Sequence, residues 1–145
     1  MAIRYTEEQY KALTGMEPPK KPDKYHRSPR EMRTVDGIVF ASLKEARDYF
    51  DLKRRQMAGE IRNLRTQVPF RLEVEGKKVG KYVADFVYEE KQEGEWKKVV
   101  ADSKPDTQAM TPEKRRDYFN RPAVKLYLIK KNLMRELYGI EVKEL

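Results

Sequence analysis

The sequence predicts one mixed α/β domain with a basic N-terminal tail, and three observations support this fold class. Segments with helical periodicity lie on both sides of a central block of strand-like segments, which are rich in β-branched and aromatic residues. Turn residues separate these strand-like segments at short intervals. The chain of 145 residues, 39% hydrophobic and 39% charged, can fill one core beneath an unusually ionic surface.

The first 33 residues are predicted to be a flexible appendage, and the domain is expected to span residues 34–145. Thr6-Glu7-Glu8-Gln9 fits a capping box and Gly15 is a helix stop, so a short helix is expected between them. Residues 16–30 contain four prolines among lysines and arginines, which is typical of an extended linker. A solvated tail is favoured over a specific docking element, although both interpretations stay open.

A tight turn and a helix open the domain. Asp36-Gly37 is a turn pair that leads into a short strand at residues 38–40. Ser42-Leu43-Lys44-Glu45 fits a second capping box, and Gly59 is expected to end the helix that starts there. The predicted apolar stripe of this helix consists of Leu43, Ala46, Phe50 and Met57.

Three sequential strands follow, and we expect them to pair in antiparallel fashion. Residues 67–74 form the first strand, and Pro69 suits a sheet edge or a strand entry. Residues 75–78 are a turn into the second strand at residues 82–88. A polar connection at residues 89–94 then leads to the third strand at residues 96–104.

After the third strand the sequence returns to helical patterns. Thr111-Pro112-Glu113 combines an N-cap residue with proline at the first helical position, and this helix is expected to reach Phe119. A second helix should run from Pro122 to Tyr138, where Gly139 stops it, and residues 140–142 are expected to form a short closing strand. The predicted apolar stripe of the second helix consists of Leu126, Ile129, Leu133 and Leu137.

Composition excludes several classes of protein. The chain has no cysteine, which excludes disulfides and thiolate zinc sites, and its only histidine is His26, which excludes the Ser-His-Asp triad and most zinc enzymes. No apolar run approaches membrane-spanning length and no signal peptide is visible, so we expect a cytoplasmic protein without a membrane partner. The net charge of +8 favours a polyanionic partner, and nucleic acid is the commonest.

Charged residues interrupt the two most apolar strands. Because side chains alternate between the faces of a strand, Asp102 and Lys104 share one face, and Asp85 can meet them from the neighbouring strand. One interpretation is an internal salt bridge. We favour a site for a divalent cation and a phosphate, because a buried ion pair is rarely the best way to stabilise a sheet.

The order and spacing of several segments resemble the PD-(D/E)XK nuclease superfamily. More closely, they resemble a family of small phage-encoded proteins grouped with those nucleases. The matching segments are Asp36–Phe40, Ser42–Ala46, Ala58–Ile61, Tyr82–Phe86, Asp102–Lys104, Lys130–Met134 and Tyr138–Ile140. The resemblance covers residues 36–145. It implies a restriction-endonuclease-like core, in which a helix, three antiparallel-leaning strands, a helix and a further strand form a mixed sheet.

The resemblance also implies a Mg²⁺- or Mn²⁺-dependent endodeoxyribonuclease, acting on branched or replication and recombination intermediates of a phage in a bacterial host. Asp85, Asp102 and the backbone carbonyl of Ser103 would hold the metal, and Lys104 would orient the attacking water or stabilise charge in the transition state. Glu45 would add an acid from the first helix, although the same residue fits the capping box. The side chain of Gln67 would contact a phosphate or have only a structural role beside the local turn.

Two positions depart from the pattern of these relatives. An acidic residue is usual where Ala101 stands, and a glycine is usual where Pro105 stands. Ala101 faces away from Asp102 by strand alternation, so its loss need not remove a metal ligand. Pro105 stiffens the exit from the strand and removes a backbone donor.

Residues 111–135 hold most of the positive charge, with eight basic and two acidic residues and a net charge of +6. A solvated helix face is the ordinary explanation, but the position directly after the predicted site favours a surface that binds the DNA backbone. The basic residues assigned to DNA binding are Lys114, Arg115, Arg116, Arg121, Lys125, Lys130 and Lys131.

Other functions and assemblies stay open at this stage. The main alternative is a non-catalytic DNA- or RNA-binding protein that keeps the fold as a scaffold. A further alternative is a protein-interaction module that uses the tail. A homodimer would let two sites cut paired strands, whether the DNA is duplex or branched.

Overall fold

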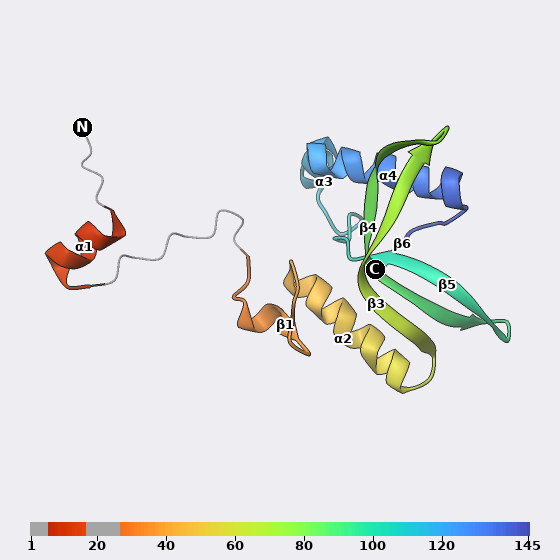
Figure 1. The fold of residues 1–145 in the computed structure, drawn as a ribbon, viewed down its shortest axis with the longest axis horizontal. Coiled ribbons are helices and arrows are strands. Elements are labelled where there is room, and N and C mark those ends of the chain that lie inside the picture. The colour runs from red at the N-terminus through yellow and green to blue at the C-terminus, as the bar shows by residue number, and fades with distance from the viewer. Residues whose placement is uncertain (1–5, 17–26) are drawn as a thin grey trace.

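The computed structural model describes residues 6–16 and 27–145, and it has the mixed α/β character that the sequence predicts (Figure 1). Its elements are α1 (Glu7–Thr14), the 3₁₀ turn η1 (Glu31–Arg33), β1 (Thr34–Val35), β2 (Ile38–Val39), α2 (Leu43–Met57), β3 (Ile61–Val74), β4 (Lys77–Gln92), β5 (Glu95–Asp102), α3 (Pro112–Asn120), α4 (Pro122–Tyr138) and β6 (Lys143–Glu144).

The capping box predicted for the first helix is present. The side chain of Thr6 accepts from the backbone N–H of Gln9, the side chain of Gln9 accepts from the backbone N–H of Thr6, and Gly15 ends the helix in the left-handed region. Most of the predicted proline-rich linker, with His26, lies outside the described residues. The end of the predicted tail is bonded to the domain, because the guanidinium of Arg33 reaches the carbonyl of Phe40; within the tail, Arg33 Nε also donates to the carbonyl of Ser28 at 2.8 Å.

Three glycine-containing turns set the hairpins. Asp36-Gly37, Glu75-Gly76 and Glu93-Gly94 all have positive φ at both residues, the conformation that a two-residue turn between antiparallel strands requires. The first two turns are where the sequence predicts them. The third is shorter than the expected connection at residues 89–94, because the β4–β5 ladder continues to the pair of Gln92 and Glu95.

The main sheet has the strand order β3-β4-β5-β6. The first three strands are antiparallel, as predicted, and β3 with Pro69 lies at the edge. The closing strand is shifted from its expected position at residues 140–142 to residues 143–144, and it runs parallel to β5. Val142 is instead buried in the core, which is why the apolar pattern of 140–142 suggested a strand.

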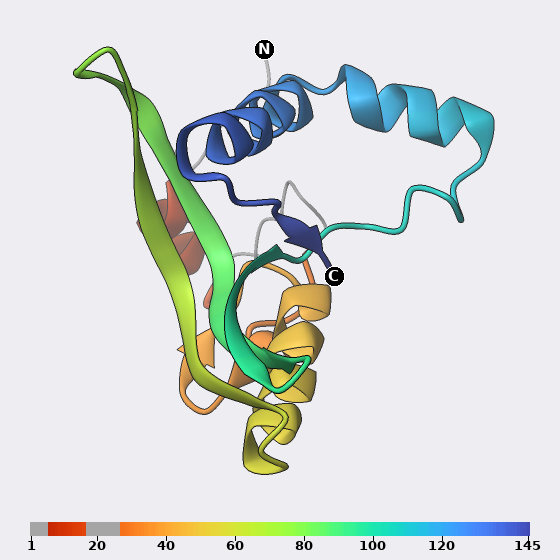
Figure 2. The same ribbon diagram turned by 90° about the vertical axis from the view of Figure 1, so that its right-hand side faces the viewer.

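Helices α2 and α4 pack on opposite faces of this sheet (Figure 2). Successive residues of one strand show this directly, because Phe86 joins the cluster beneath α2 whereas Val87 joins the cluster beneath α4. The buried members of the α2 cluster are Phe40, Ala46, Tyr49, Leu52, Ile61, Phe86, Tyr88 and Ala101. Those of the α4 cluster are Leu72, Tyr82, Ala84, Val87, Val100, Met134 and Val142.

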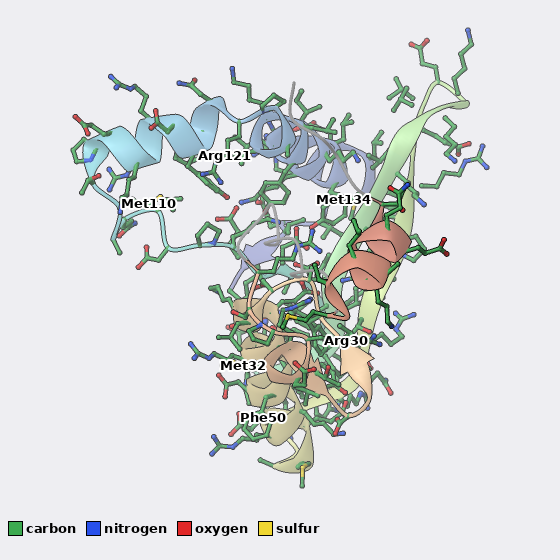
Figure 3. The ribbon with its side chains drawn as sticks, turned by 90° about the vertical axis from the view of Figure 1, so that its left-hand side faces the viewer. Arg30, Met32, Phe50, Met110, Arg121 and Met134 are labelled. Carbon is green, nitrogen blue, oxygen red and sulfur yellow. The ribbon has the colours of Figure 1, made fainter. Side chains whose placement is uncertain are left out.

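The predicted apolar stripes of both helices are only partly confirmed: Ala46 is buried and Leu133 packs against the cluster beneath α4, but other predicted members are exposed. On α2, Phe50 lies on the outer side with 52% of its surface exposed and Met57 is 81% exposed, while Tyr49 and Leu52 are buried (Figure 3). On α4, Leu126, Ile129 and Leu137 are exposed, and Met134 is the buried residue. Both helices carry apolar residues on more than one face, so periodicity alone could not select the buried one.

Candidate active site

The candidate site lies where the backbone ladder of the sheet is interrupted on both sides of Asp85. Strand β3 pairs Thr66 with Phe86 and Val68 with Ala84, but skips the intervening pair of Gln67 and Asp85. Gln67 has φ 52°, a left-handed conformation in which the regular ladder cannot continue. On the other side, the β4–β5 ladder ends at Phe86 and Ala101. The position of Asp85 is therefore free of regular pairing with either neighbouring strand.

The carboxylates of Asp85 and Asp102 replace this missing pairing. The backbone N–H of Asp85 donates to Asp102 Oδ1 at 3.0 Å, and the backbone N–H of Ser103 donates to Asp85 Oδ2 at 3.0 Å. These reciprocal bonds between side chain and backbone hold the two acids side by side where the strands separate. Burial, followed by the negative charge of Asp102, raises the pKa of the Asp85 carboxyl, and the Ser103 N–H opposes this effect.

Glu45 joins the two aspartates from the first turn of α2. Its backbone N–H donates to Ser42 Oγ at 3.1 Å, so the helix cap uses the backbone of Glu45, whose side chain is only 5% exposed. That side chain accepts from Gln67 Nε2 at 3.0 Å, and the same amide nitrogen lies 3.3 Å from Asp85 Oδ1. Gln67 therefore bridges Glu45 and Asp85, and both residues that the sequence left between two roles lie at this site.

The surroundings of Glu45 make it difficult to ionise. Burial first, and then the charge of Asp85, raise the pKa of Glu45 to about 7. Hydrogen bonding to the backbone of Ala41 and to Gln67 opposes this rise, and the charge of Asp102 adds to it. Three acids therefore share a weakly solvated space, and their mutual repulsion would be relieved by a cation.

Lys104 supplies the positive charge nearest to Asp102. Its Nζ lies 3.4 Å from Asp102 Oδ2, so the shared strand face predicted from the sequence is present. The same ammonium lies 4.2 Å from the ring centroid of Tyr127 on α4, a cation–π distance. The salt bridge considered from the sequence therefore exists, and the charge of Lys104 also lowers the pKa of Asp85, but one ammonium faces three neighbouring acids.

A pocket of about 280 Å³ opens beside the aspartates, between β4, the end of β5 and α4. Asp85, Asp102 and Lys104 line it, together with two further lysines, Lys81 and Lys130. Its remaining lining residues are Tyr82, Val83, Ala123, Leu126 and Tyr127. Carboxylates and ammonium groups in the lining of one pocket suit a cation together with a phosphate.

Sequence reasoning missed several residues of this site. Tyr82 and Tyr127 line the pocket, but their aromatic character suggested only strand and core packing. Asp48 Oδ2 accepts from Ser103 Oγ at 2.5 Å and from Lys44 Nζ at 2.9 Å, and so fixes the segment that carries Ser103. The spacing of three between Glu45 and Asp48 on one helix was a usable signal, because it places both acids on one helix face.

The basic residues of α3 and α4 differ in what their side chains contact. Lys114, Arg116 and Lys125 are exposed to solvent. Arg115 instead holds the preceding loop, because its guanidinium donates to the carbonyls of Thr107 at 2.8 Å and Gln108 at 3.1 Å.

The remaining basic residues have partners or lie near the site. Lys131 Nζ donates to Glu144 Oε1 at 3.1 Å, and Arg121 lies at the junction of α3 and α4, with its guanidinium 5.9 Å from the ring of Tyr118 (Figure 3). Lys130 lines the pocket itself. The predicted DNA-binding set is thus split between an outer helical surface and the site.

The described part of the chain carries neither a preformed metal cage nor a membrane span. Within it, no three acidic or histidine side chains already converge on one point. None of the helices in residues 6–16 and 27–145 combines the length and the apolar composition that crossing a membrane requires.

Comparison with known proteins gives one match. The model of the family described as "Protein of unknown function (DUF1064)" matches residues 24–135. No curated protein and no solved structure matches the chain. The matched range contains Glu45, Gln67, Asp85, Asp102 and Lys104, so the family model spans the whole candidate site.

Proposed function

The chain belongs to the family of proteins of unknown function DUF1064, and we propose that it is a Mg²⁺- or Mn²⁺-dependent endodeoxyribonuclease. The observation that carries this proposal is the group of carboxylates formed by Glu45, Asp85 and Asp102. The amide of Gln67 bridges Glu45 and Asp85, the backbone N–H of Asp85 donates to Asp102, and the ammonium of Lys104 lies beside Asp102. Negative charge exceeds positive charge here, and burial together with the charge of a neighbouring acid raises the pKa values of Glu45 and Asp85. A divalent cation would reverse this imbalance.

The order of elements supports the same proposal. A helix, three antiparallel strands, further helices and a strand parallel to the third follow one another, with α2 and α4 on opposite faces of the sheet. This is the order expected of the restriction-endonuclease-like core that the sequence resembles. Glu45 lies in α2, Asp85 in β4 and Asp102 at the end of β5, and this distribution of acids over three elements supports the proposal.

The residues present fit a hard cation. Mg²⁺ prefers oxygen ligands and is commonly held by one or two carboxylates with waters and substrate phosphates, so a closed cage of three acidic side chains is not required. Asp85, Asp102 and the backbone carbonyl of Ser103 would hold it. The Ser103 N–H faces Asp85, and in an extended segment the carbonyl of a residue points to the same side as its N–H.

The bound ion and the residues of the chain would have different roles in the reaction. When bound, the cation would act as a Lewis acid that neutralises phosphate charge and lowers the pKa of an attacking water. Lys104 lies beside Asp102 and would orient that water or stabilise negative charge on the phosphate in the transition state. Glu45, with a pKa near 7, can hold or release a proton at the edge of the site near neutral pH.

The surroundings of the site favour a polyanionic substrate. Lys81, Lys104 and Lys130 line the pocket, and exposed cations continue along α3 and α4. These groups can contact phosphates without reading a base sequence. The proposal of branched DNA, such as a recombination or replication intermediate, rests on the resemblance to phage-encoded relatives. The proposal of DNA in general rests on the charge.

Incubation with four DNA forms tests the proposal. Supercoiled plasmid, linear duplex, single strands and a four-way junction are each incubated with Mg²⁺, Mn²⁺ or EDTA. We expect metal-dependent cleavage of at least one form and none in EDTA. Asp102→Asn should abolish cleavage and keep DNA binding, whereas Asp51→Asn, which changes an exposed aspartate of α2, should cut like the parent. If Asp102→Asn cuts as fast as the parent, the site is wrongly assigned.

The second candidate function is a non-catalytic DNA- or RNA-binding protein with the same fold. One observation favours it: Lys104 is held between Asp102 and the ring of Tyr127, so its ammonium has to leave the ring to act on a substrate. Titration of the DNA-free protein with Mg²⁺ and Mn²⁺ separates the two functions. Absence of metal binding, together with retained nucleic-acid binding, supports the scaffold.

A further inference from the structure

The hydroxyl of Tyr82 lacks a hydrogen-bond partner although it lies inside the protein. Tyr82 is 3% exposed, and its Oη is one of two buried side-chain polar atoms without a partner among the described residues. Its residue lines the same pocket as Asp85, Asp102 and Lys104. Leaving a buried hydroxyl unpaired is unfavourable, and a phenylalanine would fill the same space without this cost. A function for the hydroxyl itself would explain why the chain carries tyrosine here.

The carboxylate of Asp102 is the group with which the Tyr82 hydroxyl can interact. Burial raises the pKa of the Tyr82 hydroxyl, and the charge and hydrogen-bonding proximity of the Asp102 carboxylate raise it further, although the contact does not have the geometry of a formed hydrogen bond. In the metal-free protein both oxygens of Asp102 face other donors, since Oδ1 accepts from the N–H of Asp85 and Oδ2 lies 3.4 Å from Lys104 Nζ. Each carboxylate oxygen can accept more than one hydrogen bond, so Asp102 still has acceptor capacity for the hydroxyl of Tyr82.

This arrangement changes if Asp102 becomes a metal ligand. A cation held by Asp102 would repel the ammonium of Lys104, and the carboxylate would then lose one of its donors. Carboxylates that bind metals are commonly held in orientation by a second hydrogen bond from outside the coordination sphere. The Tyr82 hydroxyl is a donor without a competing partner, and it is already placed in the same pocket.

We propose that Tyr82 is a positioning residue, whose hydroxyl donates a hydrogen bond to the Asp102 carboxylate when a divalent cation binds. The inference rests on the proposed metal-dependent function. It assigns to this aromatic residue a role in metal affinity rather than in packing. The ring of Tyr82 packs in the core beneath α4 in either state, and only the partner of its hydroxyl changes.

The chain supplies a matched control for this proposal. Tyr88 lies on the same strand, is 1% exposed, and has the other buried hydroxyl without a partner in the described residues. It belongs to the cluster beneath α2 and does not line the pocket of Asp85 and Asp102. Tyr82→Phe and Tyr88→Phe thus remove equivalent atoms, one beside the carboxylates and one away from them.

The experiment measures Mg²⁺ and Mn²⁺ affinity by calorimetry in the DNA-free protein, and the melting temperature in EDTA. We expect Tyr82→Phe to bind the metals about 10- to 100-fold more weakly, the range found for loss of such outer partners, with a melting temperature in EDTA equal to or above that of the parent. Tyr88→Phe should bind metal like the parent. Raising the Mg²⁺ concentration should restore cleavage by Tyr82→Phe.

Three results would count against the proposal in different ways. Parental metal affinity in Tyr82→Phe overturns it and leaves the nuclease function intact. A melting temperature of Tyr82→Phe in EDTA well below that of Tyr88→Phe also overturns it, because the hydroxyl would then have a structural partner without metal. A parent protein that binds neither metal rejects the proposed function, and the role of Tyr82 with it.

Discussion

Glu45→Gln is the substitution that separates a helix cap from a member of an acidic site. The cap bond runs from the backbone N–H of residue 45 to Ser42 Oγ, so glutamine keeps it. Glutamine also keeps a carbonyl oxygen that can accept from Gln67. What it removes is a carboxyl group that ionises inside the protein, and the loss of that ionisation has a measurable effect on stability.

The magnitude and its sign follow from the pKa of Glu45. Burial, and then the charge of Asp85, raise it from 4.5 to about 7. Between these values the folded state binds more protons than the unfolded state, so the free energy of unfolding falls as the pH rises. At roughly 1.4 kcal/mol per pKa unit, the parent protein loses about 3 kcal/mol by the time the pH exceeds 7, and loses none below about pH 4.5.

The assay is denaturant unfolding in EDTA at several pH values. Because Glu45→Gln removes the titrating group, its stability relative to the parent should rise from near zero at acidic pH to about 3 kcal/mol at pH 8. Glu136→Gln changes an exposed glutamate of α4 and should follow the parent at every pH. Parallel stability curves for the parent and Glu45→Gln would refute the argument, because Glu45 would then titrate at its ordinary pH.

Glu45→Gln also tests whether Glu45 takes part in DNA cleavage. If Glu45 belongs to the site, cleavage should fall sharply in Glu45→Gln even though the protein is at least as stable as the parent. Unchanged cleavage would assign the residue to the fold alone. The effect of Mg²⁺ on the free energy of unfolding is a second test, because the cation offsets the negative charge that destabilises the parent. Its stabilising effect should therefore be larger in the parent than in the variant at pH 8.

The remaining predictions concern the lysine, the DNA surface and the tail. Lys104→Ala should lower the cleavage rate by about 10²-fold or more with little change in DNA affinity, and an unchanged rate would contradict its role. Replacing Lys114 and Arg116 with glutamine, while keeping Arg115 to hold its loop, should weaken binding to all sequences. It should also flatten the salt dependence, by about 0.9 in the log–log slope for each phosphate that the variant no longer neutralises. A salt titration in Ca²⁺ with an unchanged slope would place the DNA surface elsewhere. Deleting residues 1–26 should leave a cooperative melt, because Arg33, whose guanidinium reaches the carbonyl of Phe40 in the domain, is kept, and a molten truncated protein would contradict this.

Local signals predicted the turns and the helix caps well, whereas β3 and β4 both begin earlier than the sequence pattern suggested and β4 also ends later. Asp36-Gly37 and Glu75-Gly76 occupy turns that need positive φ at both positions, and a short-range preference of this kind does not depend on the rest of the fold. The caps at Ser42, Thr111 and Gly139 are equally local and are all present. The buried faces of α2 and α4 were not predictable in this way, because burial depends on which apolar residues happen to meet the sheet.

The contacts of the candidate site also fall into those that local sequence patterns predict and those that depend on tertiary packing. The shared face of Asp102 and Lys104 follows from strand alternation and holds in the structure. The contact of Glu45 with Gln67 requires the packing of α2 on the sheet and the unusual φ of Gln67, neither of which the sequence pattern reveals. The sequence indicated Glu45 and Gln67 as candidate site residues, but it did not decide between a functional and a structural role for either.

The interruption of the sheet at Asp85 is itself an argument for a ligand. A continued ladder would pair the N–H groups of Asp85 and Ser103 with backbone carbonyls and would bring no charge into the sheet. The chain instead pairs these groups with the carboxylates of Asp102 and Asp85, and so holds two like charges side by side at a cost in stability. Departures from regular structure that lower stability are expected where a protein acts on something else. A cation between these acids would convert the destabilising repulsion into attraction, and for that reason stability in the presence and absence of metal is the most direct measurement to make on this protein.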